Sequence, residues 1–275
     1  MDAPGVLLRR AGLAPKKSWG QNFLSDIGLL DRIAAAAALQ PGDVAVELGA
    51  GLGHLTERLL ATGARVVAVE RDRDLAVLLR RELPAAQVVE ANAATVSIRE
   101  VAGGPAVVVG NLPYHLSSRI LFHVLAQRAD LVRLVFTLQA EFADRLAAGP
   151  GSRTYGALSV QAQALCEVER LFTIPAGAFH PRPEVDSAVV RLAPHAIPRA
   201  RLAGGPAFDR TVRAAFGQRR KTLANALANG GLPDVGRALE QAGIDGGRRA
   251  ETLTVEEFGR LAEAFSSRPG SGPSP

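Results

Sequence analysis

Short runs rich in β-branched residues alternate with helical patterns between Asp43 and Gln139, and this alternation limits the fold more than any other feature of the chain. Strands are expected over 43–48, 65–70, 86–90, 106–110 and 132–139, with helical patterns that include 52–61, 74–83 and 117–126. Strands that alternate with helices of about ten residues form a parallel sheet that helices cover on both faces. The sequence therefore predicts an α/β fold whose ligand crevice lies at the carboxyl ends of the strands.

The flanking residues predict the rest of the architecture. An irregular basic lead-in precedes a helix over 26–39, and two strands over 168–174 and 185–192 follow a helix near 157–166. The loop Phe179–Glu184 contains two prolines and is expected to lack regular structure. Beyond Pro194 only helical patterns remain, at 208–216, 221–228, 235–242 and 255–265. We expect an α/β domain over 1–194, a small all-helical domain over 195–267 and a disordered tail over 268–275.

Composition excludes several classes of protein. Apolar residues make up 47% and charged residues 21% of the chain, which is typical of globular proteins. No apolar run approaches the ~20 residues of a membrane span, and the first residues lack a signal-peptide pattern, so we expect a cytoplasmic protein. The single cysteine, Cys166, excludes an internal disulfide, and the histidines lack ligand-like spacing, so no metal site is expected.

Positive charge points to a polyanionic partner. The net charge is +5, and residues 199–221 carry seven basic side chains against one acid, Asp209. A second basic group consists of Arg9, Arg10, Lys16 and Lys17. Such clusters attract a phosphate backbone, although an arginine-rich chain or a solvated helix face accounts for them equally well.

A glycine-rich loop follows the first expected strand. Residues 47–53 read Glu-Leu-Gly-Ala-Gly-Leu-Gly, and His54 stands where a dinucleotide-binding fingerprint would need glycine. The pattern resembles the motif of Rossmann-like S-adenosylmethionine (SAM) methyltransferases. Glu70 ends the second strand 21 residues after Gly49, and an acid at that distance accepts hydrogen bonds from ribose hydroxyls. The alternative interpretation is a structural turn beside a surface glutamate.

The sequence Asn111-Leu112-Pro113-Tyr114 follows the fourth strand, on the same expected edge as the glycine loop. An aromatic exocyclic amine is a poor nucleophile because its lone pair is delocalised into the ring. The Asn111 side-chain oxygen and the Leu112 carbonyl could accept from its N–H bonds, while Tyr114 stacks the base. This is positional and electrostatic catalysis without a covalent intermediate. The alternative is a turn with a buried tyrosine.

Six segments, in order, make the chain similar to the small-subunit ribosomal RNA adenine N6,N6-dimethyltransferase family. They lie at 17–24, 47–53, 111–114, 155–160, 179–192 and 216–222, and the resemblance covers about residues 16–265. It implies a Rossmann-like SAM methyltransferase sheet for the first domain and an RNA-binding role for the helical domain. It also implies that SAM is bound by Asn22, Leu24, Gly49, Gly51, Glu70, Asn92 and Asn111.

Asn92 departs from the family pattern, which normally has an aspartate that accepts from the cofactor's adenine amine. An asparagine oxygen still accepts that bond without charge assistance, so we expect SAM binding to weaken by about 1 kcal/mol.

The resemblance also implies the substrate. Two adjacent adenosines in the 3′-terminal hairpin loop of small-subunit (16S) rRNA would each receive two methyl groups, on a precursor of the 30S subunit. Tyr114 and Phe179 would hold the flipped adenine between them, and Arg219, Arg220 and Lys221 would bind RNA backbone. The enzyme is expected to act as a monomer.

Three alternatives remain at this stage. The erythromycin-resistance methylases of large-subunit rRNA share the Asn-x-Pro-Tyr site, but residues 185–191 and 218–222 favour the small-subunit group. DNA adenine methyltransferases usually carry Asp-Pro-Pro-Tyr instead. A weakly catalytic RNA-binding assembly factor is suggested by Asn92 and opposed by the intact segments 47–53 and 111–114.

Overall fold

The computed structural model describes residues 1–16 and 19–267, which form two compact units. The first unit contains 1–143 and 169–194, and the second contains 144–168 and the residues from His195 onward. The change at Pro194 coincides with the expected boundary, but segment 144–168 groups with the C-terminal helices instead of the α/β domain. Lys17 and the tail expected to be disordered lie outside the described residues.

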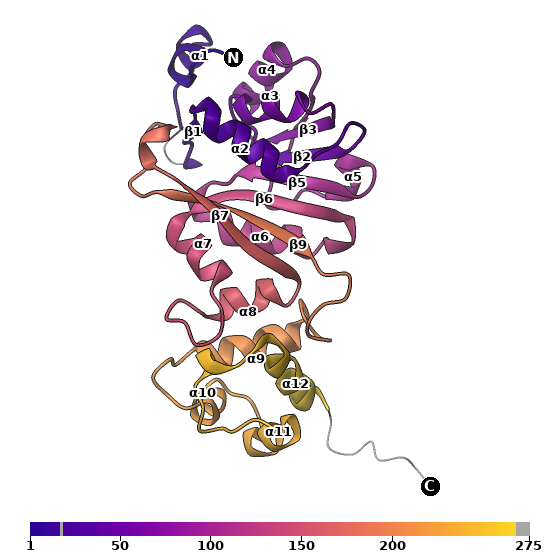
Figure 1. Cartoon of the computed structure of the whole chain (residues 1–275), viewed down its shortest axis with the longest axis vertical. Helices are drawn as coiled ribbons and strands as arrows, with labels where there is room; N and C mark the ends of the chain where they lie inside the picture. The colour runs from indigo at the N-terminus through magenta and orange to yellow at the C-terminus, as the bar shows by residue number, and fades with distance from the viewer. Residues whose placement is uncertain (17–18, 268–275) are drawn as a thin grey trace. The chain divides into compact units, whose positions relative to one another are not determined.

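A seven-stranded sheet with the order β4-β3-β2-β5-β6-β9-β7 organises the α/β part (Figure 1). The five strands that share one direction are β2 (Val44–Leu48), β3 (Arg65–Glu70), β4 (Gln87–Glu90), β5 (Ala106–Asn111) and β6 (Leu131–Gln139). β9 (Ser187–Pro194) pairs with β6 in the antiparallel direction, and β7 (Cys166–Ile174) forms the edge beside it. The parallel arrangement expected for the five strands between Asp43 and Gln139 is confirmed, whereas the sequence predicted no direction for the two later strands.

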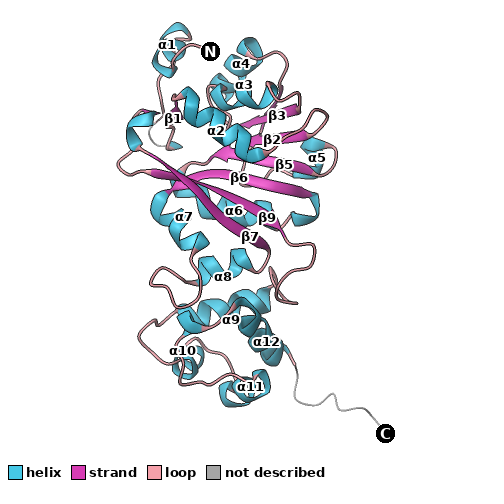
Figure 2. Ribbon diagram, in the orientation of Figure 1, coloured by secondary structure: helices cyan, strands magenta, loops and turns pink. Residues whose placement is uncertain are grey.

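Helices cover both faces of the sheet, as the sequence predicts. α2 (Ile27–Ala37) crosses one face and α6 (Ser117–Leu125) lies on the other (Figure 2). The Asp26 carboxylate caps α2 by accepting from Leu29 N at 2.9 Å, and Ile33 packs against Val109 of β5. The remaining helices that connect the strands are α3 (His54–Leu60), α4 (Arg73–Glu82), α5 (Ile98–Ala102) and α7 (Ala140–Ala147).

The structure corrects two sequence predictions, one for the basic lead-in and one for the loop that begins at Phe179. Residues 4–10 form the helix α1 (Pro4–Arg10), whose Leu7 and Leu8 are buried against Leu52, Leu75 and Leu78. The residues 179–180 form a short strand, β8 (Phe179–His180), antiparallel to β1 (Phe23–Leu24). Neither element has a strong local pattern, because α1 depends on tertiary burial and β1 finds its partner far along the chain.

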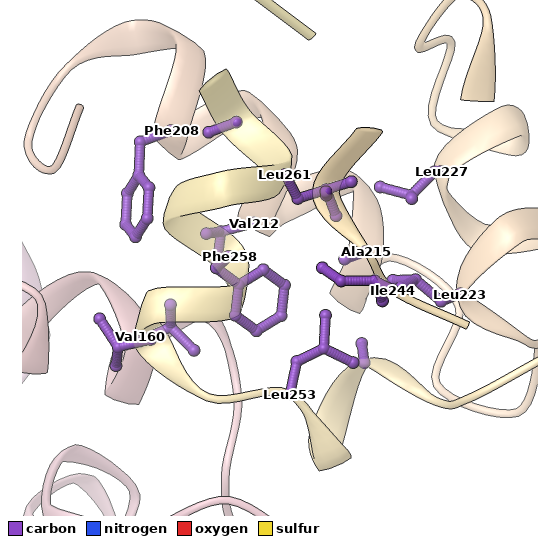
Figure 3. Close-up of a cluster of buried hydrophobic side chains, with 14 of the residues drawn as sticks. Val160, Phe208, Val212, Ala215, Leu223, Leu227, Ile244, Leu253, Phe258 and Leu261 are labelled. Atoms are coloured by element: carbon purple, nitrogen blue, oxygen red, sulfur yellow. The ribbon is translucent and has the colours of Figure 1, made fainter. Parts of the chain in front are cut away.

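The second unit has its own apolar core, formed mainly by helices together with residues of the segments between them. Its helices are α8 (Ala157–Gln163), α9 (Pro206–Phe216), α10 (Leu223–Asn229), α11 (Val235–Ala242) and α12 (Val255–Ser266). Phe208, Leu227, Phe258 and Leu261 converge in this core, and Val160 of α8 joins them (Figure 3). Val160 and the fully buried Tyr155, whose hydroxyl donates to Leu253 O at 3.1 Å, explain why segment 144–168 belongs to this unit.

We predict that Gly110→Ala destabilises the α/β unit by about 1 to 3 kcal/mol. A Cβ at this position would lie 2.7 Å from the Leu48 carbonyl oxygen of β2. The backbone of a central strand cannot move away from this contact without a cost in free energy. Urea unfolding followed by the fluorescence of Trp19, the single tryptophan, measures the loss. Gly104→Ala is the matched control, because its Cβ would meet nothing within 4 Å. Equal stability of the two variants would contradict the prediction.

Candidate active site

A cavity opens at the carboxyl edge of the parallel strands. The residues that follow β2, β3, β4 and β5 all line it, together with the segment 19–24 that precedes α2. It brings together nine of the residues singled out from the sequence: Asn22, Leu24, Gly49, Gly51, Glu70, Asn92, Asn111, Leu112 and Tyr114. Phe179, Arg219, Arg220 and Lys221 are not among the residues that line it.

The glycine loop between β2 and α3 is held in a conformation that only glycine adopts easily. Gly49, Gly51 and Gly53 have φ values of 74°, 58° and 89°, in the left-handed region. Space is also restricted, since a Cβ on Gly51 would lie 3.1 Å from the Phe23 ring. Backbone at the first two glycines can therefore approach a ligand closely.

The Glu70 carboxylate ties this loop to the end of β3. One of its oxygens accepts from Gly51 N at 2.9 Å, and the other accepts from Asp72 N at 2.8 Å. Burial raises the pKa of Glu70, and these two N–H donors partly offset that effect. A carboxylate has about four lone pairs, so capacity remains for the hydroxyls of a ribose.

Asp72 continues the network toward the N-terminal segment. Its buried carboxylate accepts from Lys16 Nζ at 2.7 Å and from Gln21 Nε2 at 2.9 Å, and it caps α4 through Asp74 N. Burial raises the pKa of Asp72, but the bonds from Lys16 and Gln21 outweigh it and hold the pKa below its ordinary value. Lys16, expected to attract phosphate, thus pairs internally with Asp72 and Asp74.

The aromatic ring of Trp19 lines the cavity between two cations. The Arg71 guanidinium carbon lies 4.2 Å and Lys16 Nζ 5.1 Å from ring centroids of Trp19. Neither Trp19 nor Arg71 was predicted from the sequence to be a site residue. The position of Arg71, directly after Glu70 at a strand end, was the available signal.

Asn111, at the end of β5, has a defined amide orientation. Its Nδ2 donates to the Asn22 carbonyl oxygen at 2.9 Å, and within the described residues its Oδ1 accepts no hydrogen bond. The donating side of the amide is therefore used by the protein, and the accepting side is available to a ligand. Asn22 contributes through its backbone to this arrangement.

Asn92 lies in the cavity wall after β4, and its Oδ1 accepts from Ala94 N at 3.0 Å. One lone pair of this oxygen remains for a second donor. The expected weaker binding of an adenine amine at this position stays a prediction.

The two aromatic residues expected to hold the adenine differ in exposure. Tyr114 is partly exposed at the cavity, with its hydroxyl 2.7 Å from Ser187 Oγ. Phe179 is 5% exposed and packs with Leu24 and Ile33. Holding a base between both rings would require the Phe179 side chain to leave this packing, so the paired arrangement stays a prediction.

Glu47, the first residue of the glycine motif, is buried beneath the loop. Its carboxylate accepts from Thr56 Oγ1 at 2.5 Å. Burial raises the pKa of Glu47 to about 8, the Thr56 hydroxyl lowers it, and the nearby Glu70 charge raises it further. Sequence analysis gave Glu47 no role beyond membership of the motif.

The basic triplet Arg219, Arg220 and Lys221 lies in the turn between α9 and α10 of the second unit, and all three residues are exposed. Arg219 donates to Arg153 O at 2.8 Å, which orders its guanidinium at the surface. Within the described residues, no ion pair involves Arg220 or Lys221. These charges are available to an anionic partner.

Two structural absences apply to the described part of the chain. None of its helices is both long and apolar enough to cross a membrane. Residues 1–16 and 19–267 contain no group of three or more His, Cys, Asp or Glu side chains that could hold a metal ion.

Two solved structures of known proteins are similar to this chain over most of its length. A solved structure of the 23S rRNA methyltransferase ErmE is 30% identical, with a TM-score of 0.68 over 89% of this chain and all of that one. A dimethyladenosine transferase from Plasmodium falciparum, 24% identical, shares the fold with a TM-score of 0.74 over 89% of this chain and 97% of that one. Fold and site together define a Rossmann-like SAM-dependent methyltransferase.

The family follows from the sequence comparisons. Residues 12–267 match the family described as ribosomal RNA adenine dimethylase. A protein of Myxococcus xanthus named ribosomal RNA small subunit methyltransferase A is 52% identical over 96% of both chains, and one of the same name from Pelotomaculum thermopropionicum is 42% identical over 94% of both. The chain belongs to the ribosomal RNA adenine dimethylase family and is a SAM-dependent enzyme.

The cavity fits the cofactor of this family. One continuous cavity is lined by the glycine backbone that would hold the methionine end, the buried acid whose spare lone pairs would bind the ribose, and Asn92, which would bind the adenine. The wall on the Asn111 side is formed by Asn111, Leu112 and Pro113, so no charged side chain there would repel the positive sulfonium.

We predict that Glu47→Gln becomes more stable than the wild type as the pH rises from about 4.5 to 8. The folded-state pKa of Glu47 is raised, so the wild type binds a proton more tightly when folded and loses stability as that proton dissociates. The difference between the two proteins reaches a few kcal/mol, at roughly 1.4 kcal/mol per pKa unit. Urea unfolding by Trp19 fluorescence at several pH values measures it.

The exposed Glu167→Gln is the matched control and should follow the wild type at every pH. A Glu47→Gln difference that does not change with pH would show that burial does not favour protonation of Glu47.

Proposed function

We propose that this enzyme transfers methyl groups from SAM to the N6 atoms of two adjacent adenosines in the 3′-terminal hairpin loop of 16S rRNA, within a precursor of the small ribosomal subunit. Each adenosine receives two methyl groups. Membership of the family and the names of the relatives support the class of RNA. The observation that carries the chemistry is the orientation of Asn111 beside the glycine-loop cavity.

The bound cofactor supplies an electrophilic methyl group on a sulfonium. The protein's contribution is to hold the amine in line with it, because the reaction needs position more than acid–base chemistry. In the first transfer Asn111 Oδ1 accepts from one N–H of the adenine amine and the Leu112 carbonyl accepts from the other; in the second transfer the amine has one N–H left for these acceptors. These bonds concentrate electron density on the nitrogen, and Pro113 fixes the direction of the chain between them.

The target base must leave its stack to reach this edge of the sheet. Tyr114 offers a partly exposed ring for stacking, an interaction worth ~1–3 kcal/mol per base. The exposed basic triplet of the second unit binds RNA backbone, which positions the enzyme without reading sequence. The proposal includes action as a monomer, in the cytoplasm where bacterial subunits are assembled.

The first test uses the purified enzyme with SAM and small subunits from a strain that lacks this modification. Large subunits and protein-free rRNA serve as parallel substrates, and mass spectrometry of the digested nucleosides identifies the product. Dimethyladenosine formed only on small subunits is the expected result. Product formed on large-subunit rRNA instead would transfer the assignment to the activity for which ErmE is named.

Asn111→Ala is expected to reduce methyl transfer by at least 10³-fold, because it removes the acceptor aimed at the amine. Binding to the small subunit should stay within about twofold of the wild type, since phosphate contacts dominate RNA affinity. Single-turnover transfer and filter binding separate the two quantities. Normal turnover by Asn111→Ala would show that the amine is bound elsewhere.

Lys221→Ala is expected to weaken binding to the small subunit and to reduce the slope of log K against log salt by about one. The exposed Lys221 forms no ion pair in the described structure, so its loss should not affect folding. Arg81→Ala on α4, an exposed arginine paired only with Glu82, is the matched control. An unchanged salt slope for Lys221→Ala would remove this residue from the RNA interface.

A further inference from the structure

The hydroxyl of Tyr114 is bound by a serine that comes from a distant part of the chain. Ser187 Oγ lies 2.7 Å from the phenol oxygen, and Ser187 itself is completely buried. Ser187 belongs to the segment 179–192, one of the six in which the chain is similar to its family, yet the proposed reaction assigns Ser187 no role. A buried hydroxyl whose partner is the ring at the methyl-transfer site is unlike an ordinary core serine.

The antiparallel direction of β9 explains how Ser187 reaches this place. Because β9 runs opposite to β6, its first residue lies beside Gln139, at the carboxyl edge where the parallel strands end. A parallel strand would bring its last residue there instead. The antiparallel direction of β9 therefore places a side chain next to Tyr114.

The backbone around Ser187 is held firmly. The carbonyl oxygen of the preceding residue, Asp186, accepts from Ala140 N at 3.0 Å, and the Asp186 carboxylate accepts from Ala176 N at 2.9 Å. Ser187 then continues directly into the ladder with β6. Its hydroxyl is thus a fixed point, in contrast to Tyr114, which begins a 3₁₀ turn after Pro113.

Burial raises the pKa of the Tyr114 phenol, and the bond to Ser187 partly offsets that rise. The phenol is therefore a neutral hydrogen-bonding group at physiological pH. The phenol oxygen lies on the axis of rotation about the Cβ–Cγ bond, so a hydrogen bond at this far end fixes rotation about the Cα–Cβ bond and with it the place of the ring.

We propose that Ser187 is a positioning residue for methyl transfer: its buried hydroxyl holds the Tyr114 ring at the place where it stacks the target adenine against the cofactor. This inference rests on the proposed function. Ser187 touches neither substrate nor cofactor and acts only through Tyr114. Its loss should lower the rate of transfer on the bound subunit without weakening the binding of the subunit.

The contact is tested without any activity measurement. The chain contains only two tyrosines, Tyr114 and Tyr155, so protein labelled with ¹³C at the tyrosine ζ carbon gives two NMR signals. Tyr114→Phe identifies the Tyr114 signal by removing it. Ser187→Ala is expected to shift and broaden this signal and to leave the Tyr155 signal unchanged. A Tyr114 signal identical to that of the wild type would overturn the proposal.

The role in transfer is tested by a double-mutant cycle on small subunits. Ser187→Ala and Tyr114→Phe each remove the same hydrogen bond, and each should lower the single-turnover rate about five- to tenfold. The double variant should be no slower than either single variant, because the two changes delete one interaction. Ser187→Thr restores the hydroxyl and should recover most of the rate.

Ser97→Ala is the matched control, since it removes the helix-capping hydroxyl of α5 in the same unit and does not line the cavity. It should retain the wild-type rate. The positioning role would be overturned if the rate reductions of the two single variants multiplied in the double variant. It would also be overturned if Ser187→Ala weakened subunit binding and left the transfer rate unchanged. A wild-type enzyme that leaves small subunits unmethylated would overturn the proposed function and this role, whereas the tyrosine signals would still establish the contact.

Discussion

The carboxylate of Glu70 is the interaction on which the site depends. It accepts from the backbone of Gly51 on one side and of Asp72 on the other, so the glycine loop and the start of α4 are held by one side chain at the end of β3. Asp72 in turn receives Lys16 and Gln21 from the N-terminal segment. The wall of the cavity is thereby assembled from three stretches of chain, which the pairing of β2 with β3 and the packing of Phe23 with Leu52 and Leu75 also bring together.

This arrangement concentrates negative charge in a place that water hardly reaches. Glu70 and Asp72 are buried near the glycine loop, and Asp72 is paired with Lys16; Glu47, whose pKa is raised to about 8, is mostly protonated at neutral pH and adds little charge. The Glu70 carboxylate, with little water around it, favours a cationic ligand, because an opposite charge nearby stabilises its ionised form. The electrostatics therefore agree with the sulfonium of the family's cofactor.

The edge that is proposed to bind the amine depends on a different constraint. β6 pairs with a parallel strand, β5, on one side and with an antiparallel strand, β9, on the other. β5 delivers Asn111 from one side and the antiparallel β9 delivers Ser187 from the other. The donor side of the Asn111 amide and the hydroxyl of Tyr114 are both used by protein partners, so the two groups present defined faces. A reaction that relies on orientation instead of a catalytic base needs such fixed side chains.

Much of this protein could be predicted without coordinates because its signals are local. The α/β alternation predicts the parallel strands. The glycine loop, Glu70 and the Asn-Leu-Pro-Tyr segment all lie at the ends of these strands, and parallel strands bring such residues to one edge. Contacts between distant segments had no local signal. The pairing of β1 with β8, the burial of α1, the internal pairing of Lys16, the packing of Phe179 and the bond between Tyr114 and Ser187 arose only in the tertiary structure. Residue type and spacing determine which groups lie at the edge of the sheet, whereas their orientation and partners depend on the packing of chain segments that the sequence separates.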